Sequence, residues 1–310
     1  MLKDPGNHIG DTWYYIEKNV CHCFYLTCPD TQPRHQCWDI AHATSMDLIH
    51  WTKHGVVVQK GEAGEWDCSC LSTGSVLRFD NRYWLAYSGK WDGEIVQIGL
   101  AVSDDLYTWK KCDWNPVCKP DGELYAKHGR GVRTFCHWRD PFLFIDSGKV
   151  YMITCATHPD APADGCGTVG ICCTEDMQHW RLLPPIEIDP IAQELECPQI
   201  LQIEDRYILL FSCYEKLFCH QLQQKYGAAL RQTSYYMTSQ NRWGPYQFEE
   251  QLQLLPIYET DRERSVQYAN RLIQFNGRWF LMGTVWSEQG DYIADPMEYS
   301  LLDGKLFLNK

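Results

Sequence analysis

The chain has 310 residues, of which 45 % are hydrophobic and 14 % aromatic, so it can bury a sizeable core. Its formal net charge of −12 argues against nucleic acid as a partner, since duplex binding needs a basic patch. The N-terminal stretch MLKDPGNHIGDTW has no apolar signal core, and no run of about 18 apolar residues follows. We therefore expect a cytoplasmic protein with no membrane partner.

Paired strands recur in order along the chain. The first strand of each pair is apolar, and the five copies read HCFYLTC, YWLAYSG, VYMITCA, YILLFSC and RWFLMGTV (278–285). The second strand ends in a Ser/Thr/Asp turn and a tryptophan, in IAHATSMDLIHW, IGLAVSDDLYTW, VGICCTEDMQHW and the degenerate SYYMTSQNRWGPY. These copies place tryptophans at Trp51, Trp109, Trp180 and Trp243.

The periodicity of these runs predicts the fold class. Apolar residues alternate with a period of two, turn residues separate the runs, and a period of 3.6 is almost absent, which indicates an all-β protein. Repeating units of several strands are typical of propellers, and five upstream strands predict five blades. The expected architecture is a single five-bladed β-propeller domain over residues 1–310, with a long-looped sandwich as the alternative.

The cysteines and histidines of the chain do not form metal-ligand patterns. Close cysteine pairs lack the C-x-x-C spacing of zinc ribbons, as in Cys21/Cys23, Cys68/Cys70 and Cys172/Cys173. Many of the 16 cysteines alternate within strand-like runs, where a free thiol behaves as a small hydrophobic group, so we expect them to be reduced and structural. The histidines show no ligand spacing either, including His42, His128 and His158. No metal and no cofactor are expected.

Charged residues open two of the apolar strands. HWRDPFLF (137–144) places Arg139 and Asp140 at the head of one strand, and LECPQILQI (195–203) places Glu196 at the head of another. In a propeller the innermost strands line the central channel, so their first residues converge at one end of the axis. Asp140 and Glu196 are expected in matching positions, and Asp11 in HIGDTWYYI is placed to join them from the first unit.

Three convergent carboxylates can cleave a glycosidic bond without a metal. One attacks the sugar or activates water, and another protonates the leaving oxygen. The acid must stay protonated near neutral pH, which burial and nearby negative charge achieve by raising its pKa. We expect Arg139 to act in the opposite direction on Asp140, keeping it ionised to bind substrate hydroxyls.

These motifs, together with LSTGSVLRF (71–79), WRDP and ECP, resemble those of the five-bladed propeller glycosidases of glycoside hydrolase family 32, the invertase and levanase type related to family 43. The resemblance implies a short form without the family's C-terminal β-sandwich. It also implies that Asp11 is the nucleophile of a retaining reaction, Asp140 the transition-state stabiliser and Glu196 the general acid and base. The implied substrate is a small β-fructofuranoside such as sucrose or a short fructan.

Other polar and aromatic residues are candidates for substrate binding. Trp13, Trp66 and Trp138 are expected either to stack on the sugar or to pack between blades. Arg139 is expected to reach the substrate. Ser72 and Thr73 are expected either to reach the substrate or to form a turn. The basic segment KHGRGVR (127–133) is either a loop over the pocket that meets an anionic sugar or a solvated loop.

Two other functions remain open at this point. An inverting arabinofuranosidase or xylosidase of the family 43 type would use Asp11 to activate water, and its carboxylates would stand further apart. A non-catalytic sugar-binding propeller would be expected to lack one of the three carboxylates. The expected partner in every case is a small carbohydrate, and the sequence leaves the oligomeric state open.

Overall fold

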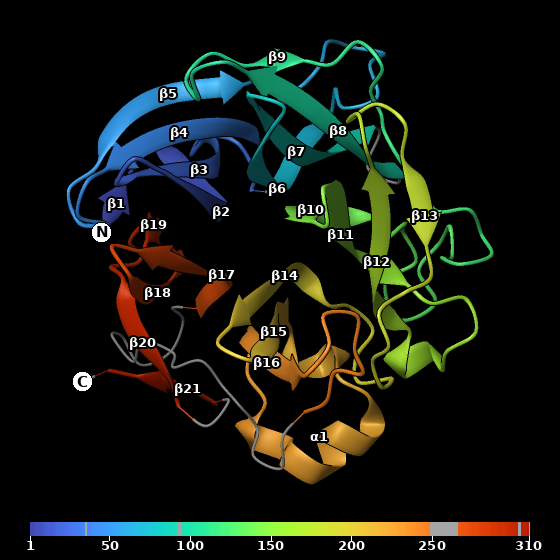
Figure 1. The fold of residues 1–310 in the computed structure, drawn as a ribbon. Helices are drawn as coiled ribbons and strands as arrows, with labels where there is room; N and C mark the ends of the chain where they lie inside the picture. The colour runs from blue at the N-terminus through green and yellow to red at the C-terminus, as the bar shows by residue number, and fades with distance from the viewer. Residues whose placement is uncertain (35, 92–94, 249–265, 303–304, 310) are drawn as a thin grey trace.

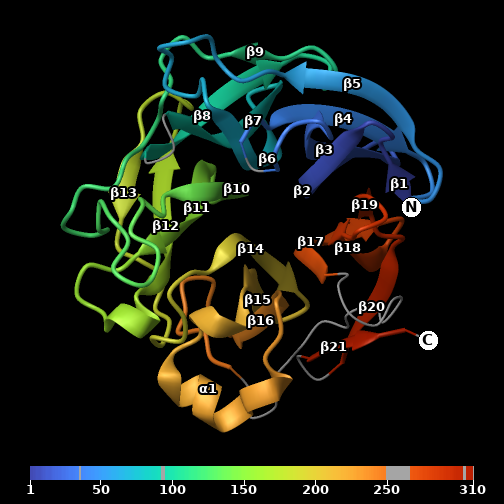
Figure 2. The same cartoon turned by 180° about the vertical axis from the view of Figure 1, so that it is seen from behind.

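The computed structural model describes residues 1–34, 36–91, 95–248, 266–302 and 305–309, and it forms five sheets around a central axis (Figure 1). The view from behind shows the same ring, with the first and last sheets side by side (Figure 2). The prediction of a five-bladed β-propeller is confirmed, and the sandwich alternative is excluded. Among the described residues, no helix has the length and apolar character needed to cross a bilayer.

Blades 1 to 3 are four-stranded antiparallel sheets in simple chain order. Blade 1 contains β2 (Asn7–Glu17), β3 (Val20–Pro29), β4 (Asp39–Ser45) and β5 (Thr52–Val58). Blade 2 contains β6 (Cys70–Phe79), β7 (Arg82–Trp91), β8 (Ile95–Ser103) and β9 (Lys110–Lys111). Blade 3 contains β10 (Arg139–Asp146), β11 (Lys149–Thr157), β12 (Gly167–Thr174) and β13 (Arg181–Leu183).

Blades 4 and 5 depart from this plan. Blade 4 contains β14 (Glu196–Ile203), β15 (Arg206–Cys213) and β16 (Thr233–Ser239), with α1 (His220–Tyr226) on its outer side (Figure 1). Blade 5 contains β17 (Val266–Phe275), β18 (Arg278–Trp286), β19 (Tyr292–Ile293), β20 (Met297–Leu302) and β21 (Lys305–Leu308). The N-terminal strand β1 (Leu2–Lys3) pairs with β19, which ties the start of the chain to the last blade.

The turn chemistry in the sequence explains the repeated unit. In blade 2 the Ser103 hydroxyl accepts from the amide of Leu106, whose φ is 71°, while Asp105 accepts the next two amides. The same turn recurs after β4 with Asp47 and after β12 with Asp176. Such local side-chain acceptors end a strand by replacing its ladder partners. The Ser/Thr/Asp turns predicted from the repeats are therefore the ends of the third strands.

Apolar clusters fill the interfaces between neighbouring blades. Ile153 of blade 3 packs in one cluster with Phe211 of blade 4, and Ile208 of blade 4 packs in another with Leu281 of blade 5. The other interfaces hold comparable clusters between blades 1 and 2, 2 and 3, and 5 and 1. All 16 cysteines are free thiols, and most are buried among these apolar side chains. Their distribution agrees with the predicted structural role.

Candidate active site

A pocket of about 230 Å³ lies where the inner strands of the blades meet. Its volume suits a single sugar ring better than a drug-sized ligand, whose pockets begin near ~300 Å³. The lining residues come from all five blades and their loops: Gly10, Asp11, Leu26, Trp38, Ser72, Thr73, Lys90, Arg133, Phe135, Arg139, Asp140, Glu196, Cys197, Tyr214, Tyr268 and Trp286. The three carboxylates predicted from the sequence are therefore brought together.

Each inner strand changes register once, at the level of the pocket. The breaks fall between Ile9 and Thr12, Ser72 and Gly74, Arg139 and Phe142, Glu196 and Gln199, and Tyr268 and Arg271. Such bulges re-aim side chains near active sites. In β6 the bulge requires glycine, because a Cβ on Gly74 would lie 2.3 Å from the carbonyl oxygen of Ala86.

The same registers correct one expectation about the carboxylates. Arg139 and Glu196 occupy the last paired position before the bulge, opposite Cys155 and Ser212. Asp140 corresponds instead to Cys197, and both have left-handed backbones with φ of 60° and 51°. Asp140 therefore lies one residue further along its strand than Glu196 does. Both residues line the pocket, because the bulge interrupts the regular alternation of side chains at this level.

Asp11 lies at the bulge of β2, facing blades 2 and 4. The Thr73 hydroxyl donates a short hydrogen bond to Oδ2 of Asp11, and the Cys197 thiol lies 3.6 Å from the same oxygen. Burial, together with the negative charge of Asp140, raises the pKa of Asp11 to about 6. Asp11 is therefore ionised at neutral pH, and its Oδ2 accepts a hydrogen bond from one hydroxyl, that of Thr73.

Asp140 is held by hydrogen bonds to one backbone amide of blade 4 and one side-chain hydroxyl of blade 2. The amide of Cys197 donates to its Oδ2 at 3.0 Å, and its own amide donates to the Ser88 hydroxyl at 2.8 Å. Burial raises the pKa of Asp140, and Arg139, whose Nε lies 3.7 Å away, opposes that rise without cancelling it. Arg139 thus acts on the pKa of Asp140 in the expected direction, but burial has the larger effect, because the arginine's close partners lie elsewhere.

Those partners are two glutamates. Arg139 Nη2 donates to Glu196 at 2.7 Å and to Glu194 at 2.5 Å, and Arg133 Nη1 lies 3.4 Å and 3.1 Å from the same two side chains. The Tyr268 hydroxyl also donates to Glu196. Burial alone would raise the pKa of Glu196, but these donors outweigh it and lower the pKa to about 2. The shift is opposite to the raised pKa expected of the general acid, because the sequence did not show that two arginines and a tyrosine converge on this side chain.

A buried cation from blade 5 lies beneath the carboxylates. Arg271 is 2 % exposed, and its Nη1 donates to the carbonyls of Cys197 at 2.7 Å and Pro198 at 3.0 Å. Its charge lowers the pKa values of Asp11 and Asp140, against the larger effect of burial. Arg271 therefore offsets part of the negative charge gathered at the end of the axis.

The three tryptophans proposed as sugar-stacking walls do not line the pocket. Trp13 and Trp138 are 2 % and 1 % exposed and belong to the apolar clusters between blades. Trp66 stacks on Tyr87 and lies against the glycine backbone of blade 2. The packing alternative is the correct one, because the blade interfaces need flat, bulky side chains.

Other aromatic residues surround the pocket. Trp38, Phe135, Tyr214, Tyr268 and Trp286 line it. Tyr268 lies two residues after the start of the inner strand of blade 5, at the register position that Arg139 and Glu196 hold in their blades. Trp38 and Phe135 lie in segments between strands, where periodicity gives no orientation.

The basic segment 127–133 reaches the pocket through one side chain. Arg133 lines the pocket, pairs with both glutamates and lies over the ring of Tyr214 at 5.1 Å. Arg130 is turned away, with its guanidinium bonded to the carbonyls of Ala161 and His158. Lys90 also lines the pocket and has no carboxylate partner among the residues the structure describes.

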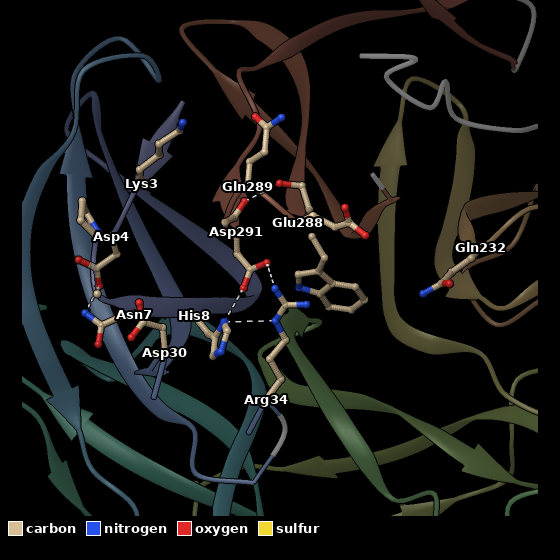
Figure 3. Close-up of a pocket in the computed structure, with 15 residues that line it drawn as sticks. Lys3, Asp4, Asn7, His8, Asp30, Arg34, Gln232, Glu288, Gln289 and Asp291 are labelled. Atoms are coloured by element: carbon tan, nitrogen blue, oxygen red, sulfur yellow. Dashed lines mark hydrogen bonds and ion pairs between the residues drawn. The ribbon is translucent and has the colours of Figure 1, made fainter. Parts of the chain in front are cut away.

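A second, wider pocket of about 730 Å³ adjoins the first between blades 5 and 1, and Trp286 lines both. Figure 3 shows Arg34 reaching Asp291 and His8 across its floor. Arg34 Nη2 donates to Asp291 at 2.7 Å, and His8 Nδ1 lies 3.1 Å from the same carboxylate. The Asp291 side chain is fully buried. The triad links the first and last blades, since His8 lies in β2 of blade 1 and Asp291 directly precedes β19 of blade 5.

The fold and the pocket define a five-bladed propeller with an acidic site at one end of its axis. A model of the glycosyl hydrolases family 32 N-terminal domain matches residues 8–296, and the chain belongs to this family. The expectation drawn from the RDP and ECP motifs is thereby confirmed.

Similar proteins include two curated enzymes named sucrose-6-phosphate hydrolase. The one from Salmonella typhimurium is 24 % identical over 313 residues, covering 96 % of this chain and 58 % of that protein. The one from Lactococcus lactis subsp. lactis is 26 % identical over 218 residues, covering 68 % of this chain and 41 % of that protein. The chain thus spans about half the length of these relatives.

Among solved structures, the inulosucrase from Halalkalicoccus jeotgali bound to kestose has a TM-score of 0.75 at 20 % identity. The match covers 98 % of this chain and 87 % of that one. At this identity the likeness supports the fold alone.

Proposed function

We propose that this protein is a retaining glycoside hydrolase that cleaves a small β-fructofuranoside such as sucrose or a short fructan. The observation that carries the proposal is the meeting of Asp11, Asp140 and Glu196 in one pocket of a family 32 domain. The pocket's volume favours one buried sugar ring, with the rest of the substrate outside it.

The proposed reaction has two steps. Asp11 attacks the anomeric carbon and forms a glycosyl–enzyme, while Glu196 protonates the departing oxygen. Water then attacks the intermediate, and Glu196 takes its proton. Asp140 accepts hydrogen bonds from sugar hydroxyls and stabilises the positive charge that develops on the ring.

The surroundings of Asp11 support the nucleophile role. Its pKa of about 6 leaves it ionised at neutral pH, and the residue lines the pocket. Membership of family 32 favours retention over the inverting family 43 alternative. The presence of all three carboxylates favours an enzyme over a non-catalytic sugar-binding protein.

The names of the curated relatives raise the question of a phosphorylated substrate. Lys90 is a pocket cation without a carboxylate partner among the described residues, so it is available to a phosphate. We propose that Lys90 favours sucrose 6-phosphate over sucrose. In Lys90→Gln, KM for sucrose 6-phosphate should rise about 10-fold while KM for sucrose changes little. Equal changes for both sugars would remove this part of the proposal.

The test of the function is a screen of the purified protein on sucrose, sucrose 6-phosphate, short fructans, and aryl arabinofuranosides and xylosides. Asp11→Asn and Glu196→Gln should abolish fructose release, while the exposed Asp113→Asn and Glu175→Gln should retain it. Release of a pentose would assign the protein to the family 43 type of activity. Absence of turnover on all substrates would contradict the proposal.

A further inference from the structure

A fourth carboxylate stands behind Glu196 and has no part in the reaction described above. Glu194 is 1 % exposed, and its Oε2 accepts from Arg139 at 2.5 Å and lies 3.1 Å from Arg133. Its Oε1 is buried and has no hydrogen-bond donor among the described residues. Glu194 and Glu196 therefore compete for the same two guanidinium groups.

The orphaned oxygen bears on the protonation of Glu194. His137 Nδ1 lies 3.8 Å from this oxygen, and that nitrogen already accepts a hydrogen bond from Arg139 Nη1 at 2.7 Å. Burial also lowers the pKa of His137 to about 3, so the ring is uncharged and offers Oε1 no proton. An ionised carboxylate with one buried oxygen unpartnered is costly, and protonating the group removes much of that cost.

We propose that Glu194 and Glu196 share one proton, and that Glu194 is the positioning residue that keeps this proton next to the catalytic carboxylate. The proposal rests on the proposed function for its catalytic consequence. In the free protein the proton resides on Glu194 and Glu196 is ionised. When substrate enters, the proton passes to Glu196 and then to the departing oxygen, leaving both glutamates ionised.

The proton balance closes over the second step. Water attacks the glycosyl–enzyme and gives its proton to Glu196, so the pair again holds one proton and the carboxylate of Asp11 is released. No further acid or base is needed. Two carboxylates that share a site can hold one proton between them, because the negative charge of one raises the pKa of the other.

The charged and titratable groups facing Glu194 are consistent with this arrangement. They are Arg139 and His137 of the blade 3 entry, Arg133 of the loop before it, Glu196, and the thiols of Cys155, Cys166 and Cys213. Burial raises the pKa of Glu194 to about 7, with Glu196 adding to the rise and the two arginines opposing it. The pair therefore loses its proton close to neutral pH.

The first test compares pH profiles of kcat/KM on sucrose for the wild type, Glu194→Gln and the exposed control Glu175→Gln. Without Glu194, Glu196 alone faces both arginines and becomes a stronger acid, so the basic limb should move down by about one pH unit or more. Glu194→Asp, which keeps a second carboxylate, should return the basic limb part of the way to its wild-type position. A uniform loss with an unmoved limb would overturn the proposal and leave Glu194 a structural residue.

The second test uses β-fructosyl fluoride, whose leaving group departs without a general acid. The deficit of Glu194→Gln on sucrose at pH 7 should shrink at least 10-fold on the fluoride. An equal deficit on both substrates would count against the shared proton.

A third measurement needs neither turnover nor a folded Glu194 variant. Infrared difference titration of the wild type should show one carboxylic acid losing its proton near pH 7, and Glu196→Gln should shift that signal. If no carboxyl group titrates there, the shared proton is refuted. If the signal appears but no fructoside is cleaved, the proposed function fails and the shared proton stands.

Discussion

The backbone amide of Cys197 donates a 3.0 Å hydrogen bond to Oδ2 of Asp140. This bond joins the bulges of two neighbouring inner strands, and both residues adopt left-handed backbones. The orientation of Asp140 is therefore fixed by the main chain of blade 4 rather than by a flexible side chain. Preorganisation of this kind is what electrostatic stabilisation of a transition state requires.

Replacing Asp140 tests this role. Asp140→Asn keeps the shape of the side chain but removes the charge, so kcat/KM for sucrose should fall about 10²–10³-fold. The melting temperature should change little, because an amide oxygen still accepts from Cys197. Steady-state kinetics and thermal denaturation check both parts, and retention of activity within twofold would contradict the role.

Asp11 sets the acidic limb of activity. Because it must be ionised to attack and its pKa is about 6, kcat/KM should decline as the pH falls below about 6. A pH profile of the wild type measures this limb directly. A limb that lies near pH 4 would contradict the burial effect.

The same pKa has a consequence for stability. Between pH about 4 and 6 the folded protein holds a proton on Asp11 that the unfolded chain releases, so this group's contribution to the free energy of unfolding falls as pH rises. Asp11→Asn removes the cost of the buried charge. It should raise the free energy of unfolding at pH 7 by about 1–2 kcal/mol, with no gain at pH 4. Urea denaturation at both pH values provides the measurement, and equal effects at the two would rule the explanation out.

Arg139 acts through its fork of donors. Its two Nη atoms serve His137, Glu194 and Glu196, and a lysine cannot reach all three. Arg139→Lys should lower kcat at least 10-fold and reduce the free energy of unfolding by about 1–3 kcal/mol, because a buried acceptor loses its donor. The matched control is Arg82→Lys, whose side chain is 58 % exposed and should tolerate the change.

The triad of Asp291, Arg34 and His8 should matter for closure of the ring. Breaking a fully buried ion pair costs about 3–5 kcal/mol, but the Arg34 side chain is 36 % exposed, so Asp291→Ala should cost about 1–3 kcal/mol. Thermal denaturation checks this against Asp104→Ala, whose carboxylate is 85 % exposed. Equal melting temperatures for the two variants would show that the triad does not stabilise closure.

Most of the fold could be predicted from the sequence, because the turns that end its strands are formed by local hydrogen bonds. The Asp105 and Asp176 turns depend on hydrogen bonds between residues two or three apart, so they are visible in a single chain segment. The five copies of the upstream strand predicted the number of blades. Register could not be predicted, since the one-residue offset between Asp140 and Glu196 arises from bulges whose position depends on neighbouring blades.

The candidate site was predictable where a charge interrupted an apolar strand. Arg139, Asp140 and Glu196 stood out because burying such groups needs a compensating partner. For Trp13 and Trp138 the sequence left sugar stacking and packing between blades open, since a period of two does not separate a side chain that faces a pocket from one that faces the next blade. Glu194 lies just outside its strand, and its burial depends on arginines more than 50 residues away.

The most direct test of the central claim is the product formed from sucrose in the presence of methanol. A covalent glycosyl–enzyme on Asp11 predicts methyl β-fructofuranoside, with the configuration of the substrate retained, and its absence in Asp11→Asn. Formation of the α-anomer would contradict the retaining mechanism. Failure to release fructose at all, from sucrose or its 6-phosphate, would contradict the proposed function itself.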